Sequence, residues 1–182
     1  MKKQTFGPFR ILSTVVLASV VAFNVYEYIN KPRIAYVRSH DLIEKYMGTR
    51  EARSVFEKKK STMMANVDSL RLDFERARNQ YISGAGRLTT QERTQQEKML
   101  GQQQSQLVQY SEAVGQKIEE EDNKMMQEVL NQINSFVENY AQEEHYDIIM
   151  GTTLSGSLLY GEKSMDITDH LLEQLNNKYK GK

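Results

Sequence analysis

Proline is absent from the whole stretch 33–182, so nothing in it forbids very long helices. In the first part of this stretch the apolar residues lie mostly three and four positions apart, which is the period of a coiled-coil seam. The positions between them are mostly charged or polar, so the pattern predicts a helix that packs one narrow stripe against a single partner. The seam residues are Phe56, Met63, Val67, Leu70, Phe74, Ala77 and Tyr81.

A turn is predicted at 83–86, where Ser-Gly-Ala-Gly supplies residues that accept positive φ. Thr89 and Glu92 then have the spacing of a capping box, which predicts the start of a second helix. This return helix is expected from about 91 to 144, so the two helices form an arm over 48–145 with its tip at 83–89. Its apolar side consists of Leu100, Leu107, Tyr110, Val114, Ile118, Met125, Val129, Ile133, Phe136 and Tyr140.

The middle of the return helix is expected to be weak. Gly101 and Gly115 each lower helix stability by about 1 kcal/mol, and glutamines crowd the stretches 95–96 and 102–109. The sequence therefore predicts a bendable distal arm.

Charge is divided unequally between the two limbs of the arm. Residues 48–88 carry nine basic and five acidic residues, a net of +4, whereas 91–145 carry four and eleven, a net of −7. One interpretation is that the limbs attract each other across an antiparallel seam. The other is that the first limb, above all Lys58-Lys59-Lys60 with Arg76 and Arg78, offers a basic stripe to anionic partners.

Short apolar runs lie on either side of the arm and predict a small body built from 33–47 and 146–179. Runs at 34–37 and 148–150 are expected to pair as strands, 158–160 to add a third, and Thr168 to cap a last helix from Asp169 to about Lys178. So small a body is marginal alone, and oligomerisation is a common remedy. The fold class is α+β, mostly α, and the residues expected to join subunits are Ile34, Tyr36, Val37, Ile148, Ile149, Leu158, Leu159 and Tyr160.

The amino terminus, 1–31, has the pattern of a membrane-targeting segment. Lys2, Lys3 and Arg10 precede or begin an uncharged apolar run, and residues 9–29 number about as many as a helix needs to cross a bilayer. Bulky residues follow Ala22, which is a poor cleavage signal, so we expect an uncleaved anchor to the inner membrane. A cleaved signal peptide is the alternative.

Composition excludes several classes of function. The formal charge is zero, with 24 basic and 24 acidic residues, so no nucleic-acid partner is expected. Cysteine is absent, and the three histidines lie far apart, so no metal site, cofactor or catalytic residue is predicted. The chain is not expected to be an enzyme.

Several strings occur in a characteristic order. Ile34-Ala-Tyr-Val37 opens the body and precedes the Gln/Lys/Glu-rich hairpin. The closing strings are 146–150 (Tyr-Asp-Ile-Ile-Met), Leu159-Tyr160 and 165–169 (Met-Asp-Ile-Thr-Asp), followed by Leu171, Leu172 and Leu175. In this combination, over about residues 33–176, the chain resembles the Skp/OmpH family of periplasmic chaperones.

The resemblance implies a homotrimer whose strands form a central body and whose hairpins project as tentacles around a cavity. It also implies an ATP-independent holdase that binds unfolded outer-membrane proteins in the periplasm. Members are often strongly basic and carry cleaved signals, whereas this chain is neutral and its leader has a poor cleavage site. No residue is therefore assigned to lipopolysaccharide binding.

Flexible or amphipathic side chains along the arm are the candidates for contact with unfolded proteins, because Met and Tyr suit promiscuous surfaces. The alternative for these residues is a place in the seam between the helices. A second class of function, a membrane-tethered coiled-coil scaffold or spacer with one specific envelope partner, is also kept open. The candidate contact residues are Met64, Tyr81, Met99, Tyr110 and Met126.

Overall fold

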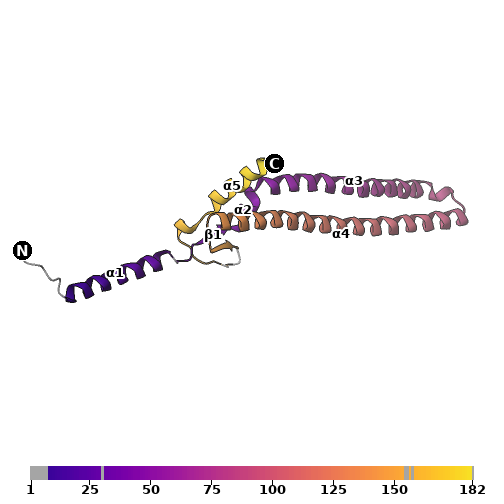
Figure 1. Ribbon diagram of the computed structural model, residues 1–182. Helices are drawn as coiled ribbons and strands as arrows, with labels where there is room; N and C mark the ends of the chain where they lie inside the picture. Colours follow the sequence, from indigo (N-terminus) through magenta and orange to yellow (C-terminus); the bar gives the residue numbers. More distant parts are fainter. Residues whose placement is uncertain (1–7, 30, 154–155, 157, 182) are drawn as a thin grey trace, which may run out of the picture.

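The computed structural model describes residues 8–29, 31–153, 156 and 158–181. A long hairpin projects from a small base, and the base combines two strands with short helices (Figure 1). The predicted α+β, mostly α fold is confirmed. In chain order the elements are α1 (Pro8–Ile29), β1 (Ile34–Arg38), α2 (Ser39–Lys45), α3 (Met47–Gly84), η1 (Ala85–Arg87), α4 (Thr90–Glu143), β2 (Ile148–Thr152), η2 (Lys163–Met165) and α5 (Thr168–Lys180).

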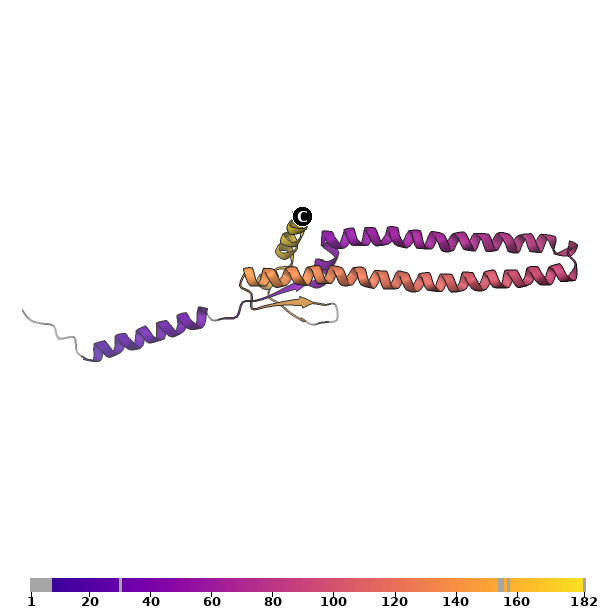
Figure 2. The ribbon, with the colours of Figure 1, turned by 45° about the vertical axis from the view of Figure 1, so that its right-hand side comes forward.

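The arm consists of α3 and α4, which lie side by side and antiparallel along their length (Figures 1 and 2). At the tip the predicted capping box is confirmed: the Glu92 amide donates to the Thr89 hydroxyl at 3.3 Å, and the Thr89 amide donates to the Glu92 carboxylate at 2.8 Å. The helix α4 continues without a break through Gly101 and Gly115. The bendability of the distal arm stays a prediction.

An elbow at Tyr46 separates α2 from α3, where the sequence pattern runs on as one helical stretch. Tyr46 has extended backbone, with φ −64° and ψ 128°, and its ring lies against that of Tyr179 with the centroids 5.5 Å apart. A Cβ at Gly48 would collide with the Tyr46 ring. The small residue that follows the elbow therefore makes room for the aromatic contact that fixes it.

The predicted pairing of the two apolar runs is confirmed. β1 and β2 form a parallel two-stranded sheet in which Ile34 is opposite Ile148 and Tyr36 is opposite Met150. Figure 2 shows the two strands side by side beneath the base of the arm. The amide of Asp147 donates to the Arg33 carbonyl at 2.9 Å and holds the start of the pairing.

The prediction of a third strand at 158–160 is wrong. Leu159 and Tyr160 are 95% and 81% exposed and belong to no strand. The second edge of β1 is already occupied: Tyr36 bridges to Asp166, and the Ile167 amide donates to the Tyr36 carbonyl at 3.1 Å. No edge of β1 is left for 158–160 to pair with.

The core lies at the base of the arm, where β1, α2, α4 and α5 meet beside the elbow. Ala35 and Val37 on one face of β1 are buried, as are Leu171 and Leu175 of α5. These two leucines are four positions apart, so they present one apolar face of a short amphipathic helix. The core cluster is completed by residues of α2, the elbow and the base of α4: Leu42, Tyr46, Val129, Ile133 and Tyr140.

Thr168 is not the helix cap that the sequence suggests. It is the first residue of α5, the N-cap position is Ile167, and the carboxylate of Asp166 accepts the Thr168 amide at 2.9 Å. The fully buried Thr168 hydroxyl instead accepts the Arg38 amide at 2.9 Å. Thr168 therefore joins the end of β1 to the start of α5, while Asp166 satisfies a free amide of the helix.

The amino-terminal helix α1 has 22 residues, in agreement with a helical segment over 9–29. Among the residues that the structure describes, no helix combines the length and the apolar character that crossing a membrane requires. The uncleaved anchor over 9–29 stays a prediction.

Candidate functional site

The seam of the arm changes character about halfway along its length. Near the base Phe56 and Val67 of α3 are buried, as are Val114 and Val129 of α4. From 68 to 113, all of which the structure describes, no residue is buried. The distal half of the arm therefore keeps its apolar side chains partly in contact with solvent.

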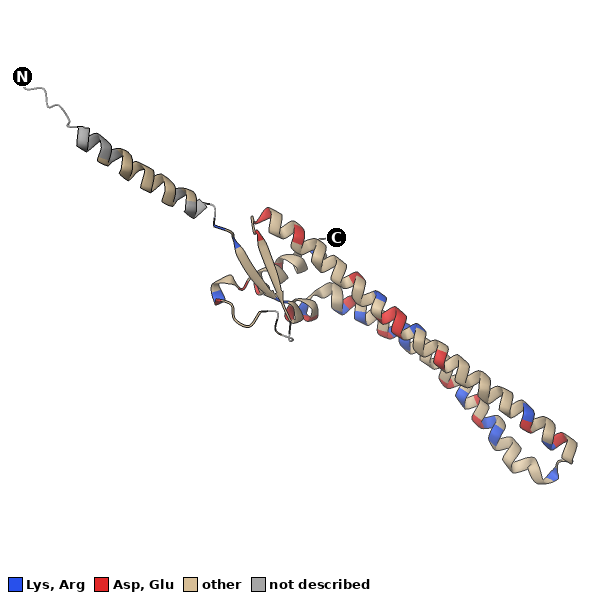
Figure 3. Cartoon of the chain, turned by 90° about the horizontal axis from the view of Figure 1, so that it is seen from below, with Lys and Arg blue, Asp and Glu red and all other residues tan. Residues whose placement is uncertain are grey.

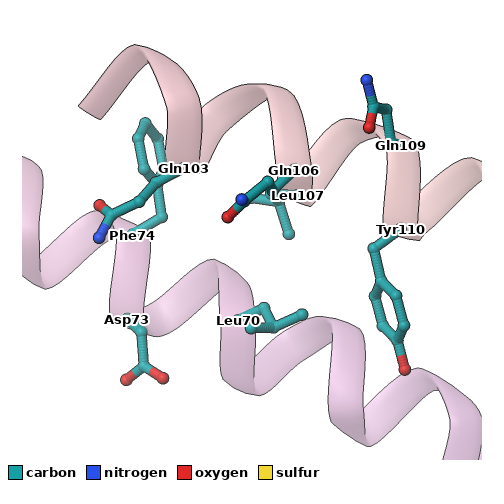
Figure 4. Close-up of a pocket in the computed structure, with 8 residues that line it drawn as sticks. All are labelled: Leu70, Asp73, Phe74, Gln103, Gln106, Leu107, Gln109 and Tyr110. Atoms are coloured by element: carbon teal, nitrogen blue, oxygen red, sulfur yellow. The ribbon is translucent and has the colours of Figure 1, made fainter. Parts of the chain in front are cut away.

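Two cavities lie in a row between α3 and α4 in this distal half, and we call them together the distal groove. The larger has a volume of about 670 Å³ and is flanked by Leu70 and Phe74 on one limb and Leu107 and Tyr110 on the other (Figure 4). The second, of about 320 Å³, lies nearer the tip, and Gln103 borders both. The remaining lining residues are Asp73, Gln106 and Gln109 of the first cavity and Ala77, Gln80, Tyr81, Gly84, Leu88, Gln96, Met99 and Leu100 of the second.

The distal groove is closed at both ends by fixed contacts. At the base end lie the buried side chains of Val67 and Val114. At the tip end the Tyr81 hydroxyl donates to the Glu97 carboxylate, and Arg93 donates to the Ala85 carbonyl at 2.9 Å. The hydrogen bond to Glu97 raises the pKa of Tyr81, so the phenol stays protonated as a donor. The separation of the limbs is thus set from both sides of the groove.

Charged residues of both signs are distributed along both limbs of the arm (Figure 3). The ammonium of Lys59 and the carboxylate of Glu121 lie 2.7 Å apart and join the two limbs near the base. The hydrogen bond from Lys59 lowers the pKa of Glu121, so this pair stays ionised. Farther out, Arg71 and Arg76 pair with carboxylates three positions earlier on their own helix. One ion pair thus joins the limbs near the base, whereas Arg71 and Arg76 are paired within α3, and the basic stripe stays a prediction.

The candidate contact residues fall into two groups. Tyr81, Met99 and Tyr110 line the distal groove, and Met99 and Tyr110 are exposed. Met64 is exposed on α3 near the base, whereas Met126 is half-buried on α4. The structure thus brings three of the five residues to one groove and leaves the other two outside it.

The residues expected to join subunits also divide by environment. Val37 is buried in the core of the chain itself, and Ile149 packs against that core. Ile34, Tyr36 and Ile148 lie on the opposite face of the sheet, together with Met150. This outer sheet face is apolar, and Ile148 is 48% exposed on it. Of the remaining three, Leu158 is half-buried, and Leu159 and Tyr160 project from a nearby loop.

Polar groups hold the base together beside that sheet. The guanidinium of Arg38 forms ion pairs with Asp41, Asp166 and Asp169 at 2.6, 3.2 and 3.3 Å. Burial acts to raise the pKa of Asp166, but its hydrogen bonds from Thr168 and the charge of Arg38 outweigh burial and lower it. The hydrogen bond from Lys45 lowers the pKa of Asp41. Within the described part of the chain no group of three or more His, Asp and Glu residues is placed to hold a metal ion.

Residues 33–175, from β1 to α5, match the family described as outer membrane protein (OmpH-like). The chain belongs to this OmpH-like family. No curated protein sequence matches it. Among solved structures, a Caulobacter crescentus CB15 protein proposed to be an outer membrane chaperone (OmpH-like) has the same fold, with a TM-score of 0.72 at 12% identity, over 81% of this chain and 86% of that one.

Part of the seam of this OmpH-like arm is more open than its spacing suggests. Leu70, Phe74 and Leu107 have seam spacing, yet Leu70 is 44% exposed and all three line the distal groove. The sequence feature that indicates this opening is a set of glutamines beside the seam. Gln96, Gln103 and Gln106 recur at helical spacing beside the apolar positions, where a tightly packed seam has long charged side chains that pair across it.

Proposed function

We propose that the protein is an ATP-independent holdase that binds unfolded outer-membrane proteins in the periplasm and prevents their aggregation. The observation that carries this proposal is the set of large apolar side chains that the arm leaves exposed. A holdase needs such a surface, since an unfolded β-barrel protein exposes apolar segments of many sequences and burial of apolar area is non-directional. These residues are Met64, Leu70, Leu72, Ile82, Met99, Val108 and Tyr110.

The family and the fold support the same function. The chain belongs to an OmpH-like family, and the Caulobacter protein of the same fold is proposed to be an outer membrane chaperone. Both the family match and the structural match include the arm as well as the base. We therefore assign client holding to the arm and assembly to the base.

We further propose that the working form is a homotrimer joined through the outer sheet face. Ile148 and Met150 are exposed on β2, and Leu159 and Tyr160 lie exposed in the loop that follows. Exposed apolar strands of this kind are an aggregation hazard unless a partner covers them. A closed trimer removes that hazard for three chains at once.

The test is aggregation of a urea-unfolded outer-membrane β-barrel protein, diluted into buffer with the full chain and without nucleotide. Light scattering should fall to near the baseline at a stoichiometric amount of chain. A variant in which 70–105 is replaced by a short Gly/Ser turn should still oligomerise but lose this effect. If the shortened arm suppressed scattering as well as the full one, client holding would belong to the base and the proposal would be wrong.

A membrane-tethered coiled-coil scaffold or spacer remains the second candidate. The observation that favours it is the unbroken 54-residue helix α4, because continuity is what a rigid spacer requires. A spacer with one specific partner would leave the aggregation of an unrelated unfolded protein unchanged. The same light-scattering measurement therefore separates the two functions.

A further inference from the structure

The distal groove is an open concavity between the two limbs. Another concavity, of about 400 Å³, lies between the same helices nearer the base, but its lining includes Lys59, Glu121, Lys124 and Glu128, whereas the lining of the distal groove is almost uncharged. Here the apolar side chains of Leu70, Phe74 and Leu107 border a cavity of about 670 Å³ instead of closing on one another (Figure 4). The chain thus presents apolar surface between its own limbs and leaves it uncovered.

The groove is built into the arm and is not a frayed end. Val67 and Val114 close the seam below it, and the Tyr81–Glu97 hydrogen bond and the capping box of Thr89 fix the tip above it. These contacts hold the two limbs together at both ends of the groove. A ligand therefore meets an opening that is already formed, which lowers the entropic cost of binding.

The lining has an unusual chemical character for a surface so rich in charge. Five glutamines border the apolar floor, and Asp73 is the single charged residue among the lining residues of the two cavities. Each glutamine amide offers two donors and an acceptor without net charge. Such groups suit the N–H and C=O groups of a main chain, which every sequence carries. The glutamines are Gln80, Gln96, Gln103, Gln106 and Gln109.

On these observations, and resting on the holdase function proposed above, we propose that the distal groove binds an extended, uncharged and apolar-rich segment of an unfolded polypeptide. In an extended chain alternate side chains point to opposite sides, so one row enters between Leu70, Phe74 and Leu107 while the other faces away. The glutamines bond the main chain. Lining residues span 70–84 on α3, about 20 Å of helix, which accommodates roughly six extended residues.

The first test uses a fluorescein-labelled peptide of alternating Val and Ser, with a matched peptide in which Asp replaces Val. Anisotropy is measured with the full chain and with Ala77→Leu, which fills the groove with an extra apolar side chain. Ala65→Leu makes the same change on an exposed part of α3 outside the groove and is the control. Ala77→Leu should weaken the Val/Ser peptide about tenfold, and Ala65→Leu by less than about twofold. Equal affinities of the two variants would overturn the proposal.

A second test locates the bound peptide without using the Ala77→Leu variant. Because the chain contains no cysteine, a single environment-sensitive dye can be placed at Gln103→Cys, which borders both cavities, or at Val108→Cys, an exposed residue that lines neither. The Val/Ser peptide should shift the emission of the first dye and leave the second unchanged. Equal shifts would place the peptide elsewhere. A shift of the groove dye by a lauryl chain but not by the peptide would make the groove a lipid site and overturn the inference.

Failure of the groove and failure of the holdase function are distinguishable. If the unaltered chain does not suppress aggregation of the unfolded barrel protein, the proposed function is wrong. If it does, and Ala77→Leu and Ala65→Leu suppress aggregation and bind peptide equally well, only the groove inference is wrong.

Discussion

The base and the distal half of the arm are made from the same two helices but pack in opposite ways. At the base, α3 and α4 meet α5 and the elbow at Tyr46, and Val129 and Ile133 are buried. Beyond Val67 and Val114 there is no third element, and every residue up to the tip is at least partly exposed. Two helices alone cover only the narrow stripe between them, where Val67 and Val114 are buried, and residues beside that stripe stay exposed.

This difference in packing suits the base and the distal arm to different roles. A core with a third partner is stable and has one arrangement, because close packing tolerates little change. A two-helix seam with a groove leaves apolar surface available to something else. The following predictions test whether the two regions are as separate as their packing implies, from the largest expected effect to the smallest.

The largest effect is expected at the outer face of the sheet. Ile148→Asp would place an unpaired charge in the proposed subunit interface, at a cost of several kcal/mol, and should convert the trimer to monomers. Val108→Asp, on a side chain exposed to a similar degree on the distal arm, should leave assembly unchanged. Sedimentation equilibrium measures both. An unchanged trimer in Ile148→Asp would show that this face does not join subunits.

Truncation of a core leucine should cost more than truncation of a groove leucine. Leu171 is fully buried, so Leu171→Ala should lower the free energy of unfolding by about 3 kcal/mol. Leu107 borders the groove and should lose less than about 1 kcal/mol on the same change, because less contact is removed. Urea unfolding followed by circular dichroism at one protein concentration compares them. Equal losses would mean that the arm and base form one packed unit.

Acid should weaken the base through the carboxylates around Arg38. The folded-state pKa values of Asp41 and Asp166 are lowered from their ordinary value of 3.8, so their ionised forms favour the folded chain. That stabilisation is complete above the unfolded pKa and disappears as the pH falls below about 4. Asp166→Asn should cost about 1 to 3 kcal/mol at neutral pH and reduce the loss of melting temperature between pH 7 and pH 3. Asp68→Asn on the arm is the control, and an identical acid loss in both variants would contradict the assignment.

Removal of a glycine should show whether the distal arm opens independently. A Cβ at Gly101 or Gly115 meets nothing within 4 Å, so alanine should stabilise the helix by about 1 kcal/mol at either site. If the regions are separate, Gly101→Ala should raise hydrogen-exchange protection of nearby amides without changing global unfolding. Gly115→Ala, next to buried Val114, should raise the global stability. Equal global shifts would mean that the arm unfolds as one piece with the base.

The smallest effect is expected from salt. The distal groove is almost uncharged, so client binding should depend on apolar contact, which added salt does not screen. The dissociation constant for an unfolded barrel protein should change by less than about threefold between about 0.05 and 0.5 M NaCl. A loss of about tenfold, or about 1.4 kcal/mol, would instead favour the basic stripe on α3 as the attracting surface.

The features that the sequence predicts correctly here are those set by local spacing. The hairpin, the Thr89–Glu92 cap and the pairing of 34–37 with 148–150 all depend on periodicity or on apolar runs with few alternatives. The errors arise where tertiary competition decides. The third strand predicted at 158–160 does not form beside β1, because Asp166 and Ile167 already occupy that edge.

The width of the groove could not be predicted from the sequence, because it too depends on tertiary contacts. Leu70 and Leu107 have the spacing of buried seam residues, and that spacing specifies which side of a helix they occupy but not how closely the second helix approaches. The approach is fixed by contacts at both ends of the groove, such as Tyr81 with Glu97. Their effect on the residues between them emerges only in three dimensions.

The parallel pairing of β1 with β2 also sets an order for folding. The hairpin can form from contacts between nearby parts of the sequence. Ile34 can pair only after Ile148 has been made, and Val37 can be buried in the core only after Leu171 has been made. Closing so long a loop is slow unless the intervening chain is already compact. As the chain emerges from its amino end, the arms should therefore exist before the base that holds them, and assembly of subunits should be gated by the arrival of the final helix.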